Sequence, residues 1–356
     1  MSLEYEVESS FNKQYSLLSR KIVRLLSENS RMSVSEIAKR LSVSRATIKN
    51  KIERLEKEAG MRYILELDER ALGLNSPHII EVKFKKKPDY GKIREMLAKS
   101  YIPQVAFSVN GSYDLVIYAN AFSGREYMHW NMAMIVLLSE YGVSWHASEM
   151  IHRHLGFFPL RNETVSRANI DEKSKSLLLC LNDNARMSFQ QISKKLGMHF
   201  NTVKYNFDKL MKSGYIKRAT ITMDLQKKLS FMTFFDDFTP TEGFEESSAK
   251  ARKVIMFDEE YPLISRYLIS GPLTGSHTLF VMSVFDDQKS AYKYGLAYHK
   301  KMYAKHSPRR VTGEVKEIIL GRLPIRSVDI KNEYKTIKWT TDFGPQESPP
   351  QPQPQK

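Results

Sequence analysis

The sequence predicts an α+β protein made of two tandem copies of one unit, a winged helix-turn-helix followed by a βαββαβ ferredoxin-like domain. Three observations carry this prediction. Residues 31–55 (RMSVSEIAKRLSVSRATIKNKIERL) have the spacing of a helix-turn-helix. The same pattern returns at residues 186–210 (RMSFQQISKKLGMHFNTVKYNFDKL), 155 positions later and without a gap. Both copies are then followed by strands and helices in the same order.

The first helix-turn-helix has recognisable start and turn signals. Ser33 and Glu36 form an S-x-x-E capping box, in which the hydroxyl and the carboxylate each satisfy a backbone N–H group at a helix start. Ser42 and Val43 are expected to make the turn, and Ser44 is placed to cap the second helix. The second helix buries aliphatic residues at helical spacing and presents basic and amide side chains elsewhere.

The second copy keeps these signals in register. Ser188 and Gln191 stand where Ser33 and Glu36 stand in the first copy. A chance helical pattern would not keep caps, turn and core aligned over 25 positions. The protein therefore acts through two copies of one module.

Each helix-turn-helix is flanked by a further helix and a strand. Residues 15–27 carry one apolar face and predict a first helix, and Gly60 is expected to end the recognition helix. Residues 61–68 alternate as a strand does, and would pair as a wing or as a lead-out strand. Gly214 and residues 216–224 repeat this arrangement.

The pattern changes after each lead-out strand to the order βαββαβ, which is typical of a ferredoxin-like fold. In the first copy the expected segments are strand 79–85, helix 90–100, strand 104–110, turn 111–113, strand 114–120, helix 125–141 and strand 143–154. In the second copy they are strand 231–237, helix 245–257, strands 263–270 and 278–285, helix 288–305 and strand 310–320.

Two short matches align the sheet domains. GSYDLVI at 111–117 corresponds to GSHTLFV at 275–281, and LGFFPLR at 155–161 corresponds to LGRLPIR at 320–326. The displacement has grown to 164–165 positions, so the second copy has about ten extra residues. We expect them in loops around 239–243 and 271–274.

These patterns divide the chain into seven segments. They are an N-terminal extension (1–14), winged helix-turn-helix 1 (15–70), ferredoxin-like domain 1 (71–160), a linker (161–169), winged helix-turn-helix 2 (170–228), ferredoxin-like domain 2 (229–327) and a C-terminal tail (328–356). From residue 344 the tail is rich in Pro and Gln and is expected to be disordered.

Composition narrows the classes of function. The formal net charge is +15 and the pI about 9.5, which favours an anionic partner, with nucleic acid as the first candidate and a membrane surface as the second. The single cysteine, Cys180, excludes a disulfide framework and a thiolate metal site and is expected to pack in a core. No apolar run approaches the roughly 18 residues of a membrane span, and no signal peptide is evident, so we expect a cytoplasmic protein without a cofactor.

A winged helix-turn-helix followed by a βαββαβ domain with a G-x-Y-D turn at 111–114 resembles the Lrp/AsnC family of transcription regulators. Arg-Met-Ser before the second helix and the aliphatic lead-out strand add to the resemblance. It implies DNA binding and, for many members, a small effector such as an amino acid held by the sheet domain. Members usually carry one copy and dimerise through the sheet, so two copies imply a pseudo-dimer within one chain. Further homodimerisation stays open.

The predicted DNA-binding residues lie on and before the two recognition helices, since Arg and Lys suit guanine edges and phosphates and Asn suits adenine. They are Ser44, Arg45, Thr47, Lys49, Asn50, Lys51 and Arg54 in the first copy, and His199, Asn201, Thr202, Lys204, Tyr205 and Lys209 in the second, with Asn206 on the same surface. The second surface is less basic and has an aromatic side chain. We therefore expect unlike half-sites, and one chain could read a non-palindromic site. An ordinary solvated basic face is the alternative.

The predicted effector residues are Gly111, Tyr113 and Asp114, as the family resemblance implies. Asp114 could pair with an α-ammonium group, or it could cap the turn through backbone groups. The second copy has His277 and Thr278 at the last two positions and so loses the carboxylate.

Parts of the sequence also suggest a metal site or an enzyme. His146, His152 and His154 share one strand face but have no carboxylate or thiolate nearby, so packing is favoured over a metal site. The sirohaem decarboxylases resemble the same two-domain plan through a His-Asn-Tyr-x-Arg stretch and an Asn-x-Trp-Phe-like strand. Residues 104–120 have neither, so we do not expect an enzyme. The remaining alternative is a metabolite-sensing protein-interaction module with degenerate DNA-reading helices.

Overall fold

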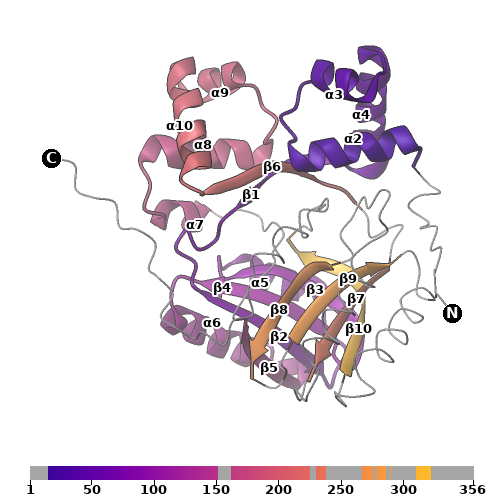
Figure 1. Ribbon diagram of the computed structural model, residues 1–356. Helices are drawn as coiled ribbons and strands as arrows, with labels where there is room; N and C mark the ends of the chain where they lie inside the picture. The colour runs from indigo at the N-terminus through magenta and orange to yellow at the C-terminus, as the bar shows by residue number, and fades with distance from the viewer. Residues whose placement is uncertain are drawn as a thin grey trace, which may run out of the picture.

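The computed structural model describes residues 15–150, 162–224, 230–237, 267–275, 277, 279–285, 289 and 310–321. Two groups of helices stand side by side at one end, and a large sheet domain lies at the other (Figure 1). A pair of long strands runs beneath both groups of helices. The expected N-terminal extension, the whole C-terminal tail (328–356) and residues 151–161 lie outside the described residues.

The first helical unit forms as predicted. It consists of α2 (Leu17–Glu28), α3 (Val34–Leu41), α4 (Arg45–Ala59) and strand β1 (Arg62–Leu67). Ser44 Oγ accepts the N–H of Thr47 at 3.0 Å, which caps α4 as expected. Gly60 ends α4 in the left-handed region at φ 60°. Ile22 and Ile48 are fully buried where the three helices meet, so packing rather than helix propensity holds these short helices.

The second helical unit repeats this arrangement. It consists of α8 (Glu172–Asp183), α9 (Phe189–Leu196), α10 (Phe200–Lys212) and strand β6 (Ile216–Thr222), preceded by the short helix α7 (Asn162–Arg167). Cys180 is buried in the core of this unit, as predicted, and its Sγ lies 3.7 Å from Met187 Sδ. Arg167 of α7 makes a two-pronged ion pair with Glu126, with N–O distances of 2.7 and 2.8 Å. The guanidinium lowers the pKa of Glu126 to about 2 and ties this unit to the first sheet domain.

One prediction about the caps is half wrong. The full capping box forms in the second copy, where Ser188 and Gln191 exchange two hydrogen bonds. In the first copy Ser33 Oγ accepts from Glu36 N at 3.1 Å, but the Glu36 carboxylate accepts from Arg40 Nη2 at 2.8 Å. An ion pair one turn along the helix has replaced the reciprocal bond.

The lead-out strands β1 and β6 pair with each other and not with their own units. They run antiparallel from Arg62 opposite Thr222 to Leu67 opposite Ile216. The sequence of each copy was compatible with either a wing or a lead-out strand. The pairing of β1 with β6 shows that both segments are lead-out strands. The two helical units are thereby joined through one two-stranded sheet.

The first sheet domain has the predicted βαββαβ order. Its elements are β2 (Ser76–Phe84), α5 (Tyr90–Ala98), β3 (Pro103–Gly111), β4 (Leu115–Ala121), α6 (Gly124–Leu137) with a short 3-10 turn (Ser139–Tyr141), and β5 (Val143–Met150). The strand order is β3-β4-β2-β5 and all neighbours are antiparallel. Two aromatic side chains of α6, Tyr127 and Trp130, are buried in the core beneath the sheet.

In the second sheet domain the described strands are β7 (Ser230–Asp236), β8 (Tyr267–Thr274), β9 (Leu279–Phe285) and β10 (Arg310–Leu320). β8 starts four residues later than the predicted 263–270 and includes residues 271–274, so the expected extra loop there is wrong. Gly271 and Pro272 pair with β9, which makes them strand residues. The predicted helices 245–257 and 288–305 lie outside the described residues, apart from residue 289.

The two sheets join edge to edge within the chain. β10 pairs with β3, and β5 pairs with β8, so the strands close in the order β10-β3-β4-β2-β5-β8-β9-β7. Phe107 and Tyr118 from the first copy and Phe235 and Phe280 from the second share one fully buried cluster. The predicted pairing of the two sheets inside one chain is therefore seen directly.

Candidate nucleic-acid interface

The first recognition helix, α4, presents a mostly exposed polar surface. Arg45, Lys49, Asn50 and Arg54 are exposed, while Thr47 is half-buried. Lys51, which is also half-buried, completes the predicted set. Ser44 caps the helix through Thr47, so these two side chains have a structural task besides any contact with DNA.

Carboxylates on α4 already engage two of its cations. Arg54 Nε lies 2.9 and 2.8 Å from the two carboxylate oxygens of Glu58, and Lys49 Nζ lies 3.8 Å from Glu53 Oε1. Arg45 and Lys51 have no ion-pair partner among the described residues. Because exposed pairs of this kind are worth little, they can be exchanged for phosphate contacts.

The second recognition helix, α10, presents a different surface. Lys204 and Tyr205 are exposed, and the Tyr205 side chain is one of the most exposed large apolar groups described. His199 caps the helix by accepting the N–H of Asn201 at 3.3 Å, and Thr202 is half-buried. Lys209 Nζ lies 3.0 Å from Asp171 Oδ2, and this bond raises the pKa of Lys209.

Asn206 corrects the predicted surface of α10. It was expected beside Lys204 and Tyr205, but it is 5% exposed and faces the core of its unit. Its position follows from helical spacing, since Val203, Asn206 and Leu210 share one side of the helix. Reading a buried polar residue as surface is the error that residue type alone invites.

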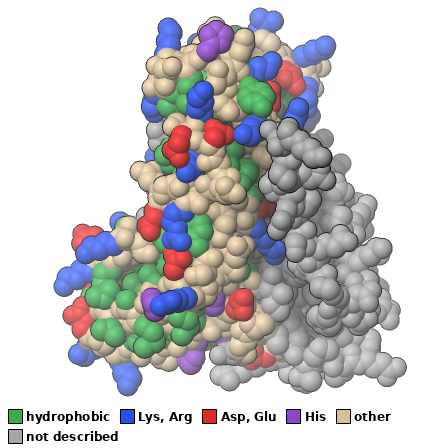
Figure 2. Space-filling view, turned by 90° about the vertical axis from the view of Figure 1, so that its left-hand side faces the viewer, with side chains coloured by type: hydrophobic (Ala, Val, Ile, Leu, Met, Phe, Trp, Pro, Cys, Tyr) green, Lys and Arg blue, Asp and Glu red, His purple; other side chains and the backbone are tan. Residues whose placement is uncertain are grey.

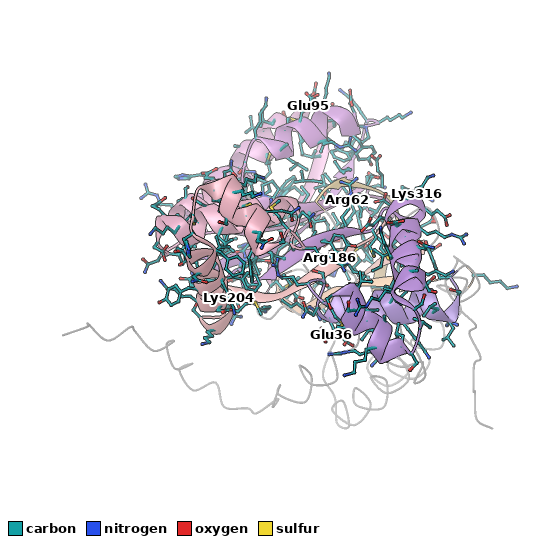
Figure 3. The ribbon with its side chains drawn as sticks, turned by 90° about the horizontal axis from the view of Figure 1, so that it is seen from above. Glu36, Arg62, Glu95, Arg186, Lys204 and Lys316 are labelled. Atoms are coloured by element: carbon teal, nitrogen blue, oxygen red, sulfur yellow. The ribbon has the colours of Figure 1, made fainter. Side chains whose placement is uncertain are left out.

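The paired strands hold α4 and α10 at the same end of the molecule (Figure 1). Basic side chains are prominent on the upper part of the molecule, over the second helical unit (Figure 2). Seen from above, Arg186 lies between the two groups of helices, whereas Lys204 lies on α10 away from that junction (Figure 3). The structure thus places both sets of predicted DNA-binding residues on one end of a single assembly.

Two arginines at this junction were missed as functional residues. Arg31 and Arg186 each reach into the opposite helical unit. The sequence contained a signal, because both stand in the same Arg-Met-Ser triplet 155 positions apart. Their contacts depend on the pairing of β1 with β6, which neither copy shows alone.

The predicted effector residues lie in the sheet domain, apart from the recognition helices. Asp114 Oδ1 lies 2.9 Å from Lys83 Nζ, and its Oδ2 accepts the N–H of Phe84 at 2.8 Å. Tyr113 is buried, and its hydroxyl is hydrogen-bonded to Thr233 Oγ1 at 2.7 Å. Both side chains thus have structural contacts in this structure, and an effector would have to exchange the bonds of Asp114.

Gly111 allows this turn to approach the second sheet. Its φ is 153°, and a Cβ there would lie 2.4 Å from the carbonyl oxygen of Thr312. Any larger residue would force β10 away from the turn. At the same glycine position in the second copy, Gly275, a Cβ would lie 2.8 Å from Ser148 Oγ.

At the corresponding place in the second copy, His277 takes the position of Tyr113. Its Nε2 lies 3.1 Å from Glu81 Oε1 of the first copy, and its Nδ1 lies 2.8 Å from Asp237 Oδ1. The bond to Glu81 raises the pKa of His277, and burial opposes this shift only in part. The turn at His277 therefore contacts the first sheet through an ionic interaction. The turn at Tyr113 contacts the second sheet through a buried aromatic ring.

Of the three histidines predicted to share one strand face, the structure describes only His146. His146 is exposed, and its Nε2 lies 3.1 Å from Ser144 Oγ. His152 and His154 lie outside the described residues. In the part of the chain that is described, no group of three or more His, Cys, Asp or Glu side chains is placed to hold a metal ion. Within the same part, no helix has the length and apolar character needed to cross a membrane.

Two segments of this chain match known DNA-binding domains. Residues 18–56 match the AsnC-type helix-turn-helix domain, and residues 170–217 match a winged helix-turn-helix DNA-binding domain. A chain with two such domains is a DNA-binding transcription regulator. It belongs to the Lrp/AsnC family.

Two transcriptional regulators are similar to about a third of this chain, and one solved structure is similar in fold over most of it. An HTH-type transcriptional regulator of Pyrococcus furiosus is 37% identical over 116 residues, which are 32% of this chain and 75% of that protein. The HTH-type transcriptional regulator LysM of Saccharolobus solfataricus is 27% identical over 126 residues, 35% of this chain and 88% of LysM. The siroheme decarboxylase NirDL superposes with a TM-score of 0.53 at 14% identity, covering 89% of this chain and 97% of NirDL. That last likeness shows the fold alone.

Proposed function

We propose that this regulator binds DNA sequence-specifically, through two unlike recognition helices that read one asymmetric site. The observation that carries the proposal is the pairing of β1 with β6, which sets α4 and α10 at one end of a single chain. A homodimer of single-copy chains would carry two identical surfaces. Here Arg45 and Asn50 of α4 correspond to Phe200 and Tyr205 of α10, so the two half-sites should differ in sequence.

The difference between the surfaces supports unequal shares of the binding. α4 carries four basic side chains in the predicted set and α10 carries two, of which Lys209 is already bonded to Asp171. Cations that neutralise phosphates release counterions and dominate affinity. The first half-site should therefore supply most of the affinity, and the second should add discrimination through Asn201 and Tyr205.

A small effector such as an amino acid is proposed at the turn 111–114, as in many family members. Asp114 would exchange its bond with Lys83 for the ammonium group of the effector. Further dimerisation of the chain and a cytoplasmic location belong to the same proposal. The fold alone does not decide against catalysis, since NirDL shares it. The proposal rests on the recognition helices, and the absence of both decarboxylase stretches from residues 104–120 supports it.

The test is selection from a randomised duplex pool at two salt concentrations, followed by sequencing of the retained DNA. The wild type is run beside Arg45→Ala/Lys49→Ala, and beside Arg24→Ala/Lys21→Ala as a variant of equal charge change on α2. We expect one enriched motif without two-fold symmetry, lost in the first variant and kept in the second.

Other outcomes would change the conclusion. A palindromic motif bound by one chain would contradict unlike half-sites. Retention without enrichment, equal in all three proteins, would indicate a non-specific basic surface. If no DNA is retained even at low salt, the protein-interaction module becomes the favoured function. Binding to a protein partner does not require the steep salt dependence that phosphate contacts produce.

A further inference from the structure

The junction between the two helical units contains a reciprocal pair of arginines. Arg31 lies in the turn between α2 and α3, and Arg186 occupies the same place between α8 and α9. Each guanidinium crosses to the other unit and bonds to the turn that holds its counterpart. Arg31 Nη1 donates to the carbonyl oxygens of Ala185 and Met187, which flank Arg186, at 2.7 and 2.9 Å. Arg186 Nη2 donates to the carbonyl oxygen of Met32, beside Arg31, at 3.2 Å.

Arg31 also reaches the second recognition helix. Its guanidinium carbon lies 4.4 Å from the ring centroid of Phe189 on α9 and 5.0 Å from that of Phe207 on α10. Phe207 is a half-buried residue of α10, the helix that also carries Lys204. Its contact with the guanidinium therefore links Arg31 to the second recognition helix. A planar guanidinium suits this contact, since its face can stack while its edge donates hydrogen bonds.

Arg186 reaches the first recognition helix by a relay. Its Nη1 donates to the Tyr63 hydroxyl at 3.0 Å, and its guanidinium carbon lies 5.0 Å from the Tyr63 ring. The Tyr63 hydroxyl in turn donates to a carboxylate oxygen of Glu56 on α4. Each arginine is therefore connected to the recognition helix of the other copy.

We infer that Arg31 and Arg186 act as positioning residues that fix the distance and angle between α4 and α10, and with them the half-site spacing that the protein accepts. Hydrogen bonds from one planar group to two carbonyl oxygens tolerate only small displacements before they weaken. Rotation of one unit against the other would break the bonds of both arginines together. This inference rests on the proposed reading of DNA by both helices, but its structural half can be tested without DNA.

The β1–β6 ladder is the competing explanation, since it joins the units too. It is supported by Ser30 N donating to the Ala219 oxygen at 2.8 Å and by Ala185 N donating to the Tyr63 oxygen at 3.1 Å. A two-stranded ribbon is, however, free to twist. The arginines lie beside this ribbon and connect the helical units directly. The test must therefore weaken the arginine contacts while the ladder and the net charge stay unchanged.

The variant that does this is Arg31→Lys/Arg186→Lys. Lysine keeps the charge but loses the planar fork and the stacking face. Arg24→Lys/Arg40→Lys is the matched control, because among the described residues both arginines form ion pairs only with glutamates of their own helices. Circular dichroism and the unfolding midpoint establish that each full-length variant is folded.

The first readout is the distance between spin labels at Glu53→Cys and Asp208→Cys, equivalent exposed positions of α4 and α10. Cys180 is buried, and labelling of the chain without the two new cysteines checks that it stays unlabelled. We expect one narrow distance distribution in the wild type and in the control, and a clearly broader one in Arg31→Lys/Arg186→Lys. An unchanged width in that variant would show that the ladder alone sets the geometry and would overturn the inference.

The second readout is affinity for the selected site and for the same site with about two base pairs inserted between half-sites, a rotation of roughly 70°. Loss of simultaneous engagement should cost the wild type on the order of 100-fold in affinity, and the lysine variant no more than about tenfold. A full spacing penalty in the lysine variant, despite a broadened distance distribution, would overturn the role in DNA reading. Absence of any selected site would refute the proposed function, while the distance measurement would still decide whether the arginines position the helices.

Discussion

The two copies share the helix caps and turns that shape their backbones, and they differ in the side chains on their contact surfaces. Caps, turns and left-handed helix ends recur at matching places, as in Ser44 and His199 or Ser42 and Gly197. The residues that face outward or across the junction between sheets have diverged. Where one copy has Tyr113, the other has His277, and where one has Arg45, the other has Phe200. A duplicated unit keeps what folding requires, because each copy must build its own core, while contact surfaces are free to specialise.

The junctions between the two sheets are the sharpest part of this comparison. Tyr113 lies edge-on to Phe235 at a centroid distance of 5.2 Å, in a buried environment. His277 stands between Glu81 and Asp237. The first junction should contribute through apolar burial at any pH, and the second through charge within a limited range of pH.

Tyr113→Ala should lower the free energy of unfolding by roughly 3–5 kcal/mol, because it removes a buried ring and leaves a cavity. The cost of His277→Ala should instead fall as the pH rises, since the variant lacks one partner of a largely buried ion pair with Glu81, which weakens once His277 loses its proton above its raised pKa. Denaturant unfolding monitored by far-ultraviolet circular dichroism measures the loss of stability in both variants. Equal losses in the two variants would mean that the junctions are energetically alike, against the comparison drawn from their contacts.

The two recognition helices should differ in their share of DNA affinity. Arg45→Ala/Lys49→Ala should weaken binding by roughly 10- to 100-fold and lower the slope of log affinity against log salt by about 1.8, as expected for two lost phosphate contacts. Lys204→Ala/Lys209→Ala should do less, because Lys209 is bonded to Asp171. Fluorescence anisotropy titrations at several salt concentrations measure both slopes. A larger effect from the α10 variant would reverse the assignment of the stronger half-site.

The ends of α3 and α9 offer a smaller and symmetrical test. Ser42 adopts the left-handed conformation at φ 54°, and it is the only non-glycine residue described with a positive φ. Gly197 occupies the equivalent position at φ 63°. Ser42→Gly should therefore stabilise the protein by about 1 kcal/mol, and Gly197→Ser should destabilise it by about the same amount. Calorimetric unfolding of both variants checks this, with Ser193→Gly inside α9 as a destabilising control. Stabilisation by Gly197→Ser would contradict backbone strain as the cause.

The pH dependence should separate two histidines. The pKa of His277 is raised by Glu81, so its contribution to stability is complete below about pH 6.5 and is lost as the pH rises through its higher folded-state pKa. Burial lowers the pKa of His78, whose ring stacks on Tyr127 at 3.4 Å, so this residue destabilises the fold as the pH falls below its ordinary value. The unfolding midpoint from pH 5 to 8 should thus lose its high-pH decline in His277→Gln and its low-pH decline in His78→Gln. An unchanged profile in both variants would refute the assignment.

Much of the fold was predictable because its signals are local. Helix starts at Ser33, Ser44 and Ser188 follow from side-chain oxygens three residues before a backbone N–H group. The order of strands and helices along the first sheet domain was predicted from alternation, helical periodicity and the turn at 111–113, whereas the order of the strands within the sheet was not. The position of β8 was wrong because Gly271 and Pro272 look like loop residues, whereas pairing with β9 makes them strand. Asn206 was wrong because its residue type outweighed its place on the helix.

The sequence by itself determined the two modules, their order and the chemistry of their recognition helices, since helix caps and hydrophobic periodicity act over a few residues. Only the tertiary structure decided which partners the modules meet. It joined β1 to β6, closed the two sheets into one cylinder of strands and brought Arg31 and Arg186 across the junction. Such contacts link residues more than 120 positions apart, and no local pattern specifies them. They arise because strand edges and guanidinium groups must find partners, and the nearest ones belong to the other copy.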